Sequence, residues 1–132
     1  MVNHPALCDT SKLVGRVLMS LLFIFAGWNK IGGYKMTEAF MVSMGLPALL
    51  LPLVIVVELI GGLAVLLGFF TRCAALILFL FCLASAWMVH LVPGDPNEMT
   101  SFMKNITIAG GFLILACAGA GRFSLDHWVR KK

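Results

Sequence analysis

Apolar positions along the chain form four long runs, separated by short clusters of polar and turn-forming residues. The runs cover residues 13–31, 46–70, 73–92 and 102–120. Each is close to the roughly 20 apolar residues that a helix needs to cross a bilayer. The pattern therefore predicts an all-α integral membrane protein, a four-helix transmembrane bundle that forms one domain over residues 1–132.

The connections between the runs constrain how the helices pack. Only Thr71 and Arg72 separate the second run from the third, so we expect these two helices to be antiparallel neighbours. Pro52 lies inside the second run and is expected to kink that helix. Lys12 and Arg16 lie at the start of the first run, where a signal peptide carries its basic residues. However, Arg16 is inside the run and no small-residue cleavage site follows. We therefore predict that the first run is a transmembrane helix and not a cleaved signal peptide.

The composition excludes a soluble globular class. Hydrophobic residues make up 61% of the chain, charged residues 12%, and the mean hydropathy is +0.99, whereas about a quarter of a soluble domain is charged. Basic residues gather at the termini and in the second connection, as Lys12, Arg16, Arg72, Arg122, Arg130, Lys131 and Lys132. By the positive-inside rule, both termini are expected in the cytoplasm. The net charge of +4 then indicates contact with anionic lipid and not with nucleic acid.

Cysteines and histidines limit the redox chemistry that the chain can hold. Cys8, Cys73, Cys82 and Cys117 contain no C-x-x-C pair, which argues against a disulfide relay and for small thiols that fill gaps. Only His90 lies in an apolar run, so paired histidine ligands for a metal or a haem are missing. We predict no intrinsic cofactor and no metal site.

Glu58 is the one charge between Glu38 and Arg72, inside the most apolar run. A carboxylate at bilayer depth costs several kcal/mol unless it is paired, protonated or hydrated, so its position is a functional-site hypothesis by default. At roughly 1.5 Å per residue, it lies about 16 Å below the start of its helix. Other polar residues are expected to converge on the same outer half of the bundle: Lys30, His90, Lys104 and Asn105.

Helical spacing makes this convergence more specific. Intervals of four and three place five residues on one stripe of the first helix: Arg16, Ser20, Phe23, Gly27 and Lys30. On the second helix, Gly61 and Gly62 share a face with Glu58, where a neighbouring helix or a flat ligand could approach the backbone. The long stem of Lys104 could reach down from the interface. We therefore predict Lys104 as the ionic partner of Glu58.

Two interpretations of this cluster stay open at this point. The polar residues could form a buried network that only holds the bundle together. They could instead surround a cavity that binds a polar headgroup, because a purely structural network can be replaced by apolar packing at little cost.

The chain resembles the DoxX family, and in particular its small bacterial inner-membrane members. The residues that carry the resemblance are Gly15-Arg16, Gly27-Trp28-Asn29-Lys30, Gly45-Leu46-Pro47, Glu58 with Gly61-Gly62, Gly68 with Thr71-Arg72, His90, Phe102-Met103-Lys104-Asn105, Gly110-Gly111 and Ser124-Leu125-Asp126. Together they cover nearly the whole chain. The resemblance implies a four-helix bundle in the inner (plasma) membrane, and a link to quinones and to membrane complexes that handle oxidative stress.

A quinone offers two carbonyl acceptors and a flat apolar ring. Lys104, His90 and Asn105 could donate hydrogen bonds to it, and Glu58 is the candidate proton carrier. Two tryptophans, Trp28 and Trp87, could stack on the ring, although tryptophans also anchor helices at membrane interfaces.

No flavin, haem, iron–sulfur or nucleotide motif accompanies these residues, so we expect no catalysis by the chain alone. A subunit that serves a redox partner fits better. Arg16 and Arg72 could dock that partner, or could reach along their stems to the interface. Two other functions stay open: a membrane scaffold or assembly factor, and a proton-coupled transporter of a small solute.

Overall fold

A computed structural model describes residues 5–90 and 94–130. The helices are α1 (Pro5–Gly32), α2 (Tyr34–Ser43), α3 (Leu50–Leu67), α4 (Thr71–Ser85), the π-helical turn η1 (Ala86–His90), α5 (Pro96–Ala118) and α6 (Leu125–Arg130). Within the described residues, four helices are long and apolar enough to cross a membrane: α1, α3, α4 continued by η1, and α5. The predicted all-α, four-span fold class is confirmed.

The helix boundaries differ from the apolar runs in informative ways. The first run begins at residue 13, whereas α1 already begins at Pro5. The second run begins at residue 46, whereas α3 begins at Leu50 and Pro52 lies in its first turn. The first backbone N–H groups of a helix have no intrahelical acceptor, so a proline is tolerated there. Pro52 therefore belongs to the N-terminal turn of α3 and does not interrupt the helix as the predicted kink required. Residues 91 and 92 of the third run lie outside the described residues.

Two short helices, α2 and α6, were not expected from hydropathy. The segment between the first two spans folds as α2 and buries Met41. The residues after α5 fold as α6, none of whose residues is fully buried. Each is too short to give an apolar run, so the pattern of hydrophobic positions predicts only connections there.

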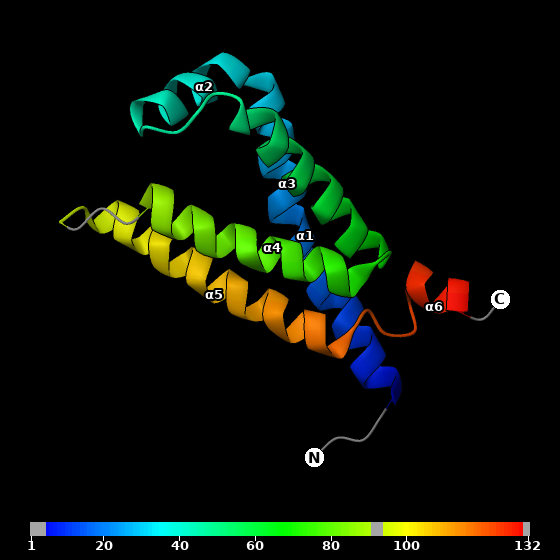
Figure 1. Cartoon of the computed structure of the whole chain (residues 1–132). Coiled ribbons are helices and arrows are strands. Elements are labelled where there is room, and N and C mark those ends of the chain that lie inside the picture. Colours follow the sequence, from blue (N-terminus) through cyan, green and yellow to red (C-terminus); the bar gives the residue numbers. More distant parts are fainter. Residues whose placement is uncertain (1–4, 91–93, 131–132) are drawn as a thin grey trace.

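The four spanning helices pack as two pairs. α1 packs mainly on α3, α4 packs mainly on α5, and contacts between α3 and α4 join the pairs. Figure 1 shows the pairs close together where α6 lies, and diverging toward α2. We call the first region the closed end and the second the splayed end. The beginning of α1 and the helix α6 both lie at the closed end.

Small residues let α1 and α3 approach closely. A Cβ atom on Gly27 would lie 2.7 Å from Cγ of Leu59, and one on Gly62 would lie 2.9 Å from Cγ1 of Ile24. The predicted stripe of α1 faces this contact, because Arg16, Ser20, Phe23 and Gly27 are the buried residues of the helix. Where the pairs meet, the Phe23 ring packs edge-on against Phe112, with ring centroids 5.3 Å apart.

Arg16 holds the closed end together from inside. Its side chain is 1% exposed, and its guanidinium donates five hydrogen bonds to backbone carbonyls. The acceptors are Val65 (3.1 Å), Leu66 (3.2 Å), Ala120 (2.7 Å) and Phe123, which accepts from both terminal nitrogens at 3.0 Å. Carbonyls near helix ends lack intrahelical donors, and one buried guanidinium satisfies several of them. Arg16 is therefore unavailable for the partner docking or interfacial anchoring that the sequence suggested.

Asp126 fastens α6 to the start of α4. Its carboxylate accepts hydrogen bonds from the backbone N–H groups of Phe70 (2.7 Å) and Thr71 (2.9 Å), and its own N–H donates to the carbonyl of Gly68 at 2.8 Å. Burial alone would raise the pKa of Asp126, but these N–H donors and nearby Arg130 hold the pKa below its ordinary value. The left-handed backbone of Gly68 (φ 72°) ends α3 and makes this junction compact.

Candidate functional site

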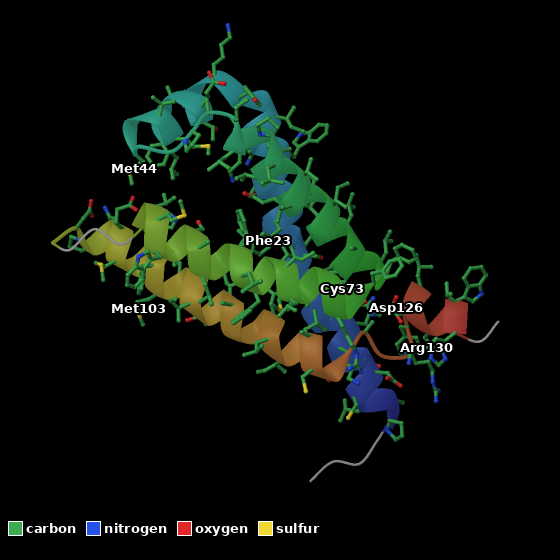
Figure 2. All side chains as sticks on the ribbon, in the orientation of Figure 1. Phe23, Met44, Cys73, Met103, Asp126 and Arg130 are labelled. Carbon is green, nitrogen blue, oxygen red and sulfur yellow. The ribbon has the colours of Figure 1, made fainter. Side chains whose placement is uncertain are left out.

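A cavity of about 640 Å³ lies at the splayed end, between the two helix pairs. Side chains from α1, α2, α3, α4, η1 and α5 line it. Figure 2 shows the diverging pairs, with Phe23 near the point where they meet and Met44 on the α2 side. This volume is within the usual range for small-molecule sites, about 300–1,000 Å³.

The cavity wall is mainly apolar with a limited set of polar groups. Phe40, Leu50, Val54 and Phe81 are among its apolar residues. Its polar residues are Lys30, Thr37, Glu58, Ser85, His90, Ser101, Lys104 and Asn105. An apolar space with a few convergent polar groups is typical of a site for a ligand with a hydrophobic body and a polar head.

Lys30 and Glu58 form an ion pair in the wall of the cavity. Nζ of Lys30 lies 2.8 Å from Oε1 of Glu58, and the side chains are 28% and 3% exposed. The predicted partner, Lys104, lies on α5 and is exposed. The prediction is wrong because α1 packs directly on α3: the close contact at Gly27 brings Lys30, one turn further along, beside Glu58.

One carboxylate oxygen of Glu58 lies outside the ion pair with Lys30. Oε2 of Glu58 is buried and, within residues 5–90 and 94–130, has no hydrogen-bond partner. The Lys30 ammonium has three N–H donors, so it can hold Oε1 of Glu58 and still donate toward the cavity. Lys30 therefore connects the buried carboxylate of Glu58 to the cavity.

His90 forms a second polar contact, with a residue that sequence reasoning missed. Nδ1 of His90 lies 2.9 Å from Oε2 of Glu98. Asp95 caps α5 by accepting from the N–H groups of Asn97 (3.0 Å) and Glu98 (3.3 Å), which sets the first turn of the helix. An acidic N-cap followed three residues later by a glutamate is a capping-box pattern. That pattern was the signal that could have identified Glu98.

Lys104 and Asn105 reach the cavity from α5. The Asn105 amide donates to the carbonyl of Ser101 at 3.3 Å, which leaves its carbonyl oxygen and one N–H for other partners. The structure therefore brings five of the predicted residues to one cavity: Lys30, Glu58, His90, Lys104 and Asn105.

Four other candidates lie elsewhere. Trp28 and Trp87 are 67% and 70% exposed and do not line the cavity, so neither is placed to stack on a ligand there. A Cβ on Gly61 would lie 3.2 Å from the Leu78 side chain, and Gly62 packs against α1. Both glycines therefore serve contacts between helices and do not form a ligand slot.

Arg72 lies at the closed end and is exposed. Among the cysteines, Cys82 is buried in the core as expected of a gap-filling thiol, whereas Cys8, Cys73 and Cys117 are exposed. In the part of the chain that the structure describes, no group of three or more His, Cys, Asp or Glu side chains could hold a metal ion.

Comparison with known proteins assigns the chain to a family. The DoxX family model matches residues 11–91, which is more than half of the chain. The chain belongs to the DoxX family. The match begins within α1 and extends through η1, and so it contains the Lys30–Glu58 pair and His90. No solved structure matches.

Two curated relatives from Escherichia coli (strain K12) support the assignment. The chain is 48% identical to "Inner membrane protein YqjF" over 124 residues, which are 94% of this chain and 95% of the relative. It is 38% identical to "Inner membrane protein YphA" over 123 residues, 87% of each chain. With four helices apolar enough to cross a membrane in the described residues, this DoxX-family chain is a multi-pass inner-membrane protein.

A more distant relative carries a functional name. The chain is 29% identical to "Putative oxidoreductase CatD" from Bacillus subtilis (strain 168) over 124 residues, 93% of this chain and 90% of the relative. The shared region again covers nearly the full length of both proteins.

Proposed function

We propose that this protein binds a quinone or quinol in the cavity at the splayed end, as a subunit of a membrane oxidoreductase or of an oxidative-stress complex. The observation that carries the proposal is the Lys30–Glu58 ion pair, in which a buried carboxylate is held by a half-buried lysine with spare N–H donors, in the wall of a largely apolar cavity between spanning helices. The similarity to a protein named as an oxidoreductase agrees with this proposal.

The chemistry of the cavity suits a quinone. The apolar wall accommodates the flat ring and its tail, and the ammonium groups of Lys30 and Lys104 and the Asn105 amide can donate to the two carbonyl oxygens. The carboxylate of Glu58 keeps Lys30 in place and can accept a proton when a quinol gives up its hydroxyl hydrogen. Electrons reach the quinone from a partner protein, because this chain carries no recognisable redox motif.

We further propose an orientation in which both termini are cytoplasmic, on the basis of the excess of lysine and arginine at the closed end. The quinone cavity then lies in the outer half of the bilayer. A quinone dissolved in the lipid would reach it by moving sideways between the diverging helix pairs, without crossing water.

A scaffold or assembly factor is the second candidate. The observation in its favour is that Glu58 is 2% exposed and already paired, as expected for a charge whose role is to hold two helices together. The two functions differ in whether the pair can be replaced by apolar side chains without loss of ligand.

The first experiment is purification in a mild detergent, followed by solvent extraction and quantification of bound quinone. We expect near-stoichiometric quinone on the wild type, and loss of it in Lys30→Met and Glu58→Gln. Lys35→Met is the matched control, because Lys35 is an exposed lysine of α2 that does not line the cavity. Equal trace amounts of quinone in all four proteins would refute quinone binding.

The double variant Lys30→Met/Glu58→Leu separates the two candidates. It replaces the ion pair with apolar side chains, and we expect it to recover the stability lost in Lys30→Met. A quinone site predicts that ligand retention stays lost in the double variant. If retention returns together with stability, the pair is only structural and the scaffold function is favoured.

A further inference from the structure

A second cavity, of about 360 Å³, lies at the closed end and is separate from the quinone cavity. It is located where α3 has ended at Leu67, α4 begins at Thr71 and α5 ends at Ala118. Three spanning helices therefore reach their ends around it. This places the cavity at the boundary between the hydrocarbon core of the bilayer and water.

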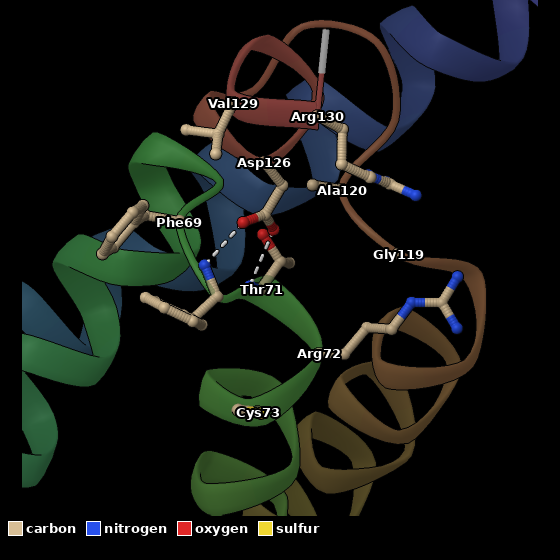
Figure 3. A pocket seen from close by; sticks show the side chains of 10 residues that line it. Phe69, Thr71, Arg72, Cys73, Gly119, Ala120, Asp126, Val129 and Arg130 are labelled. Atoms are coloured by element: carbon tan, nitrogen blue, oxygen red, sulfur yellow. Dashed lines mark hydrogen bonds between the residues drawn. The ribbon is translucent and has the colours of Figure 1, made fainter. Parts of the chain in front are cut away.

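Two arginines line this cavity, one from each side of the junction between α4 and α6. Figure 3 shows the side chains of Arg72 and Arg130 extending on the same side of Asp126. In the described residues 5–90 and 94–130, neither arginine forms an ion pair. A Cβ on Gly119 would lie 3.1 Å from a terminal nitrogen of Arg72, so that guanidinium is packed against the end of α5.

Among the described residues that line this cavity, Asp126 carries the one carboxylate, and it does not neutralise the arginines by direct contact. Both oxygens of Asp126 are occupied by backbone N–H groups, those of Phe70 and Thr71. The same bonds cap the start of α4, so these two N–H groups are not available to an anion in the cavity. The excess positive charge of the cavity is therefore carried by Arg72 and Arg130.

The rim of the cavity is apolar. Phe69, Phe70 and Val129 line it and are exposed, and the two phenylalanine rings pack edge to face with centroids 4.5 Å apart. An anion that bound here would have cationic side chains on one side and exposed apolar side chains on the other. That combination matches a phosphate attached to acyl chains better than it matches a small soluble anion.

We propose that this cavity binds the headgroup phosphate of an anionic phospholipid from the surrounding leaflet. Arg72 and Arg130 donate charge-assisted hydrogen bonds to the phosphate, and Phe70 and Val129 contact the beginning of the acyl chains. The lipid thereby joins α6, none of whose residues is fully buried, to the ends of α4 and α5.

The test is native mass spectrometry of the purified full-length protein with added phosphatidylglycerol or phosphatidylcholine. Arg72→Gln/Arg130→Gln removes the proposed ligands. Lys12→Gln/Arg122→Gln is the control, because it removes two positive charges from the same end of the bundle outside the cavity. We expect retention of one phosphatidylglycerol by the wild type and the control, and binding at least about tenfold weaker in the arginine variant.

Several outcomes would overturn the proposal. Equal losses in the two double variants would show that only the overall charge of this end matters. Equal binding of phosphatidylcholine would remove the selectivity for anionic lipid. Displacement by inorganic phosphate at millimolar concentration would identify a soluble anion as the ligand. Folding is checked in parallel by the melting temperature: phosphatidylglycerol should raise it in the wild type and the control, but not in a folded Arg72→Gln/Arg130→Gln protein.

Discussion

The two ends of the bundle each bury a charged residue, and the two residues differ in how completely their hydrogen-bonding groups are paired. At the closed end, Arg16 is 1% exposed and donates five hydrogen bonds to backbone carbonyls. At the splayed end, Glu58 is 2% exposed, its Oε1 is paired with Lys30, and its Oε2 has no partner among the described residues. A buried charged group whose hydrogen-bonding atoms are all paired stabilises the fold. A buried charged group with an unpaired atom beside a cavity is a candidate for function.

The two residues differ because the two ends of the bundle provide different hydrogen-bond partners for a buried charge. The closed end contains the last turn of α3 and the connection between α5 and α6, and backbone carbonyls of both accept from the Arg16 guanidinium. At the splayed end, Glu58 lies in the middle of α3, where the backbone groups already bond to one another. Only side chains can partner Glu58 there, and the diverging helices leave a single lysine within ion-pair distance in the described part of the chain.

The largest expected effect is the loss of Arg16. Arg16→Gln removes the guanidinium and leaves several buried carbonyls without donors, so we expect the free energy of unfolding to fall by about 3 kcal/mol or more. Unfolding in mixed detergent micelles, followed by circular dichroism, measures the change. Arg122→Gln is the control at the same end and should stay close to wild type, because Arg122 is exposed and its Nε lies 3.8 Å from Oδ2 of Asp9 in a weak surface ion pair. A cost for Arg16→Gln below that of Lys30→Met would reverse the comparison between the ends.

The second-largest expected effect is the loss of Lys30 at the splayed end. Lys30→Met leaves the Glu58 carboxylate buried and unpaired, and we expect a loss of about 2 kcal/mol. Lys104→Met should be nearly neutral for stability, because Lys104 is exposed and is not the partner of Glu58. The same unfolding assay compares the two variants. If Lys104→Met is as destabilising as Lys30→Met, the pairing in the structure is not the one that stabilises the protein.

A smaller effect tests the close contact between α1 and α3 that creates the pair. In Gly62→Ala, the new Cβ would lie 2.9 Å from Ile24, so we expect a cost of about 1–2 kcal/mol. Gly110→Ala is the matched control in α5, where a Cβ would meet nothing within 4 Å. Alanine favours helix over glycine by about 1 kcal/mol, so the control should be neutral or slightly stabilised. Equal effects of the two substitutions would contradict the close approach.

The smallest effect is the pH dependence of the α6 junction. The folded pKa of Asp126 is below its ordinary value, so the folded state binds fewer protons and its stability rises with pH in that range. The contribution is present above the unfolded value of about 3.9 and is lost as the pH falls through the folded pKa. We expect Trp128 fluorescence, in a Trp28→Phe/Trp87→Phe background, to report release of α6 below about pH 4. In Asp126→Asn this acid transition should disappear; an unchanged transition would exclude Asp126 as its cause.

Much of the candidate site could be predicted from one sequence. The stripe of α1 was correctly identified, because Arg16, Ser20, Phe23 and Gly27 follow helical spacing and are all buried. The partner of Glu58 was assigned to the wrong lysine, although Lys30 continues that stripe. Depth along the membrane was the basis of the assignment to Lys104, and depth alone does not specify which helix packs beside which.

Arg16 and Gly62 also show that the sequence alone does not specify which helices pack together. A positive charge near a helix end and a glycine beside a carboxylate each allow an exposed role and a buried role, and the sequence does not choose between them. The choice depended on the close packing of α1 on α3, which buries Arg16 against the end of α3 and uses Gly62 as a contact. Glu98 was missed because the capping pattern places it only in the first turn of α5, whereas its contact with His90 depends on how η1 packs on α5.

The sequence by itself determined the membrane class, the four spans and the buried face of the first helix, because hydropathy and helical period are local properties. It also determined that Glu58 would need a partner, because an unpaired carboxylate is costly in hydrocarbon. Only the tertiary structure decided that the partner is Lys30, that Arg16 is buried in backbone carbonyls, and that the helix pairs diverge to form a cavity. These outcomes depend on contacts between segments far apart in the chain, and no local pattern contains that information.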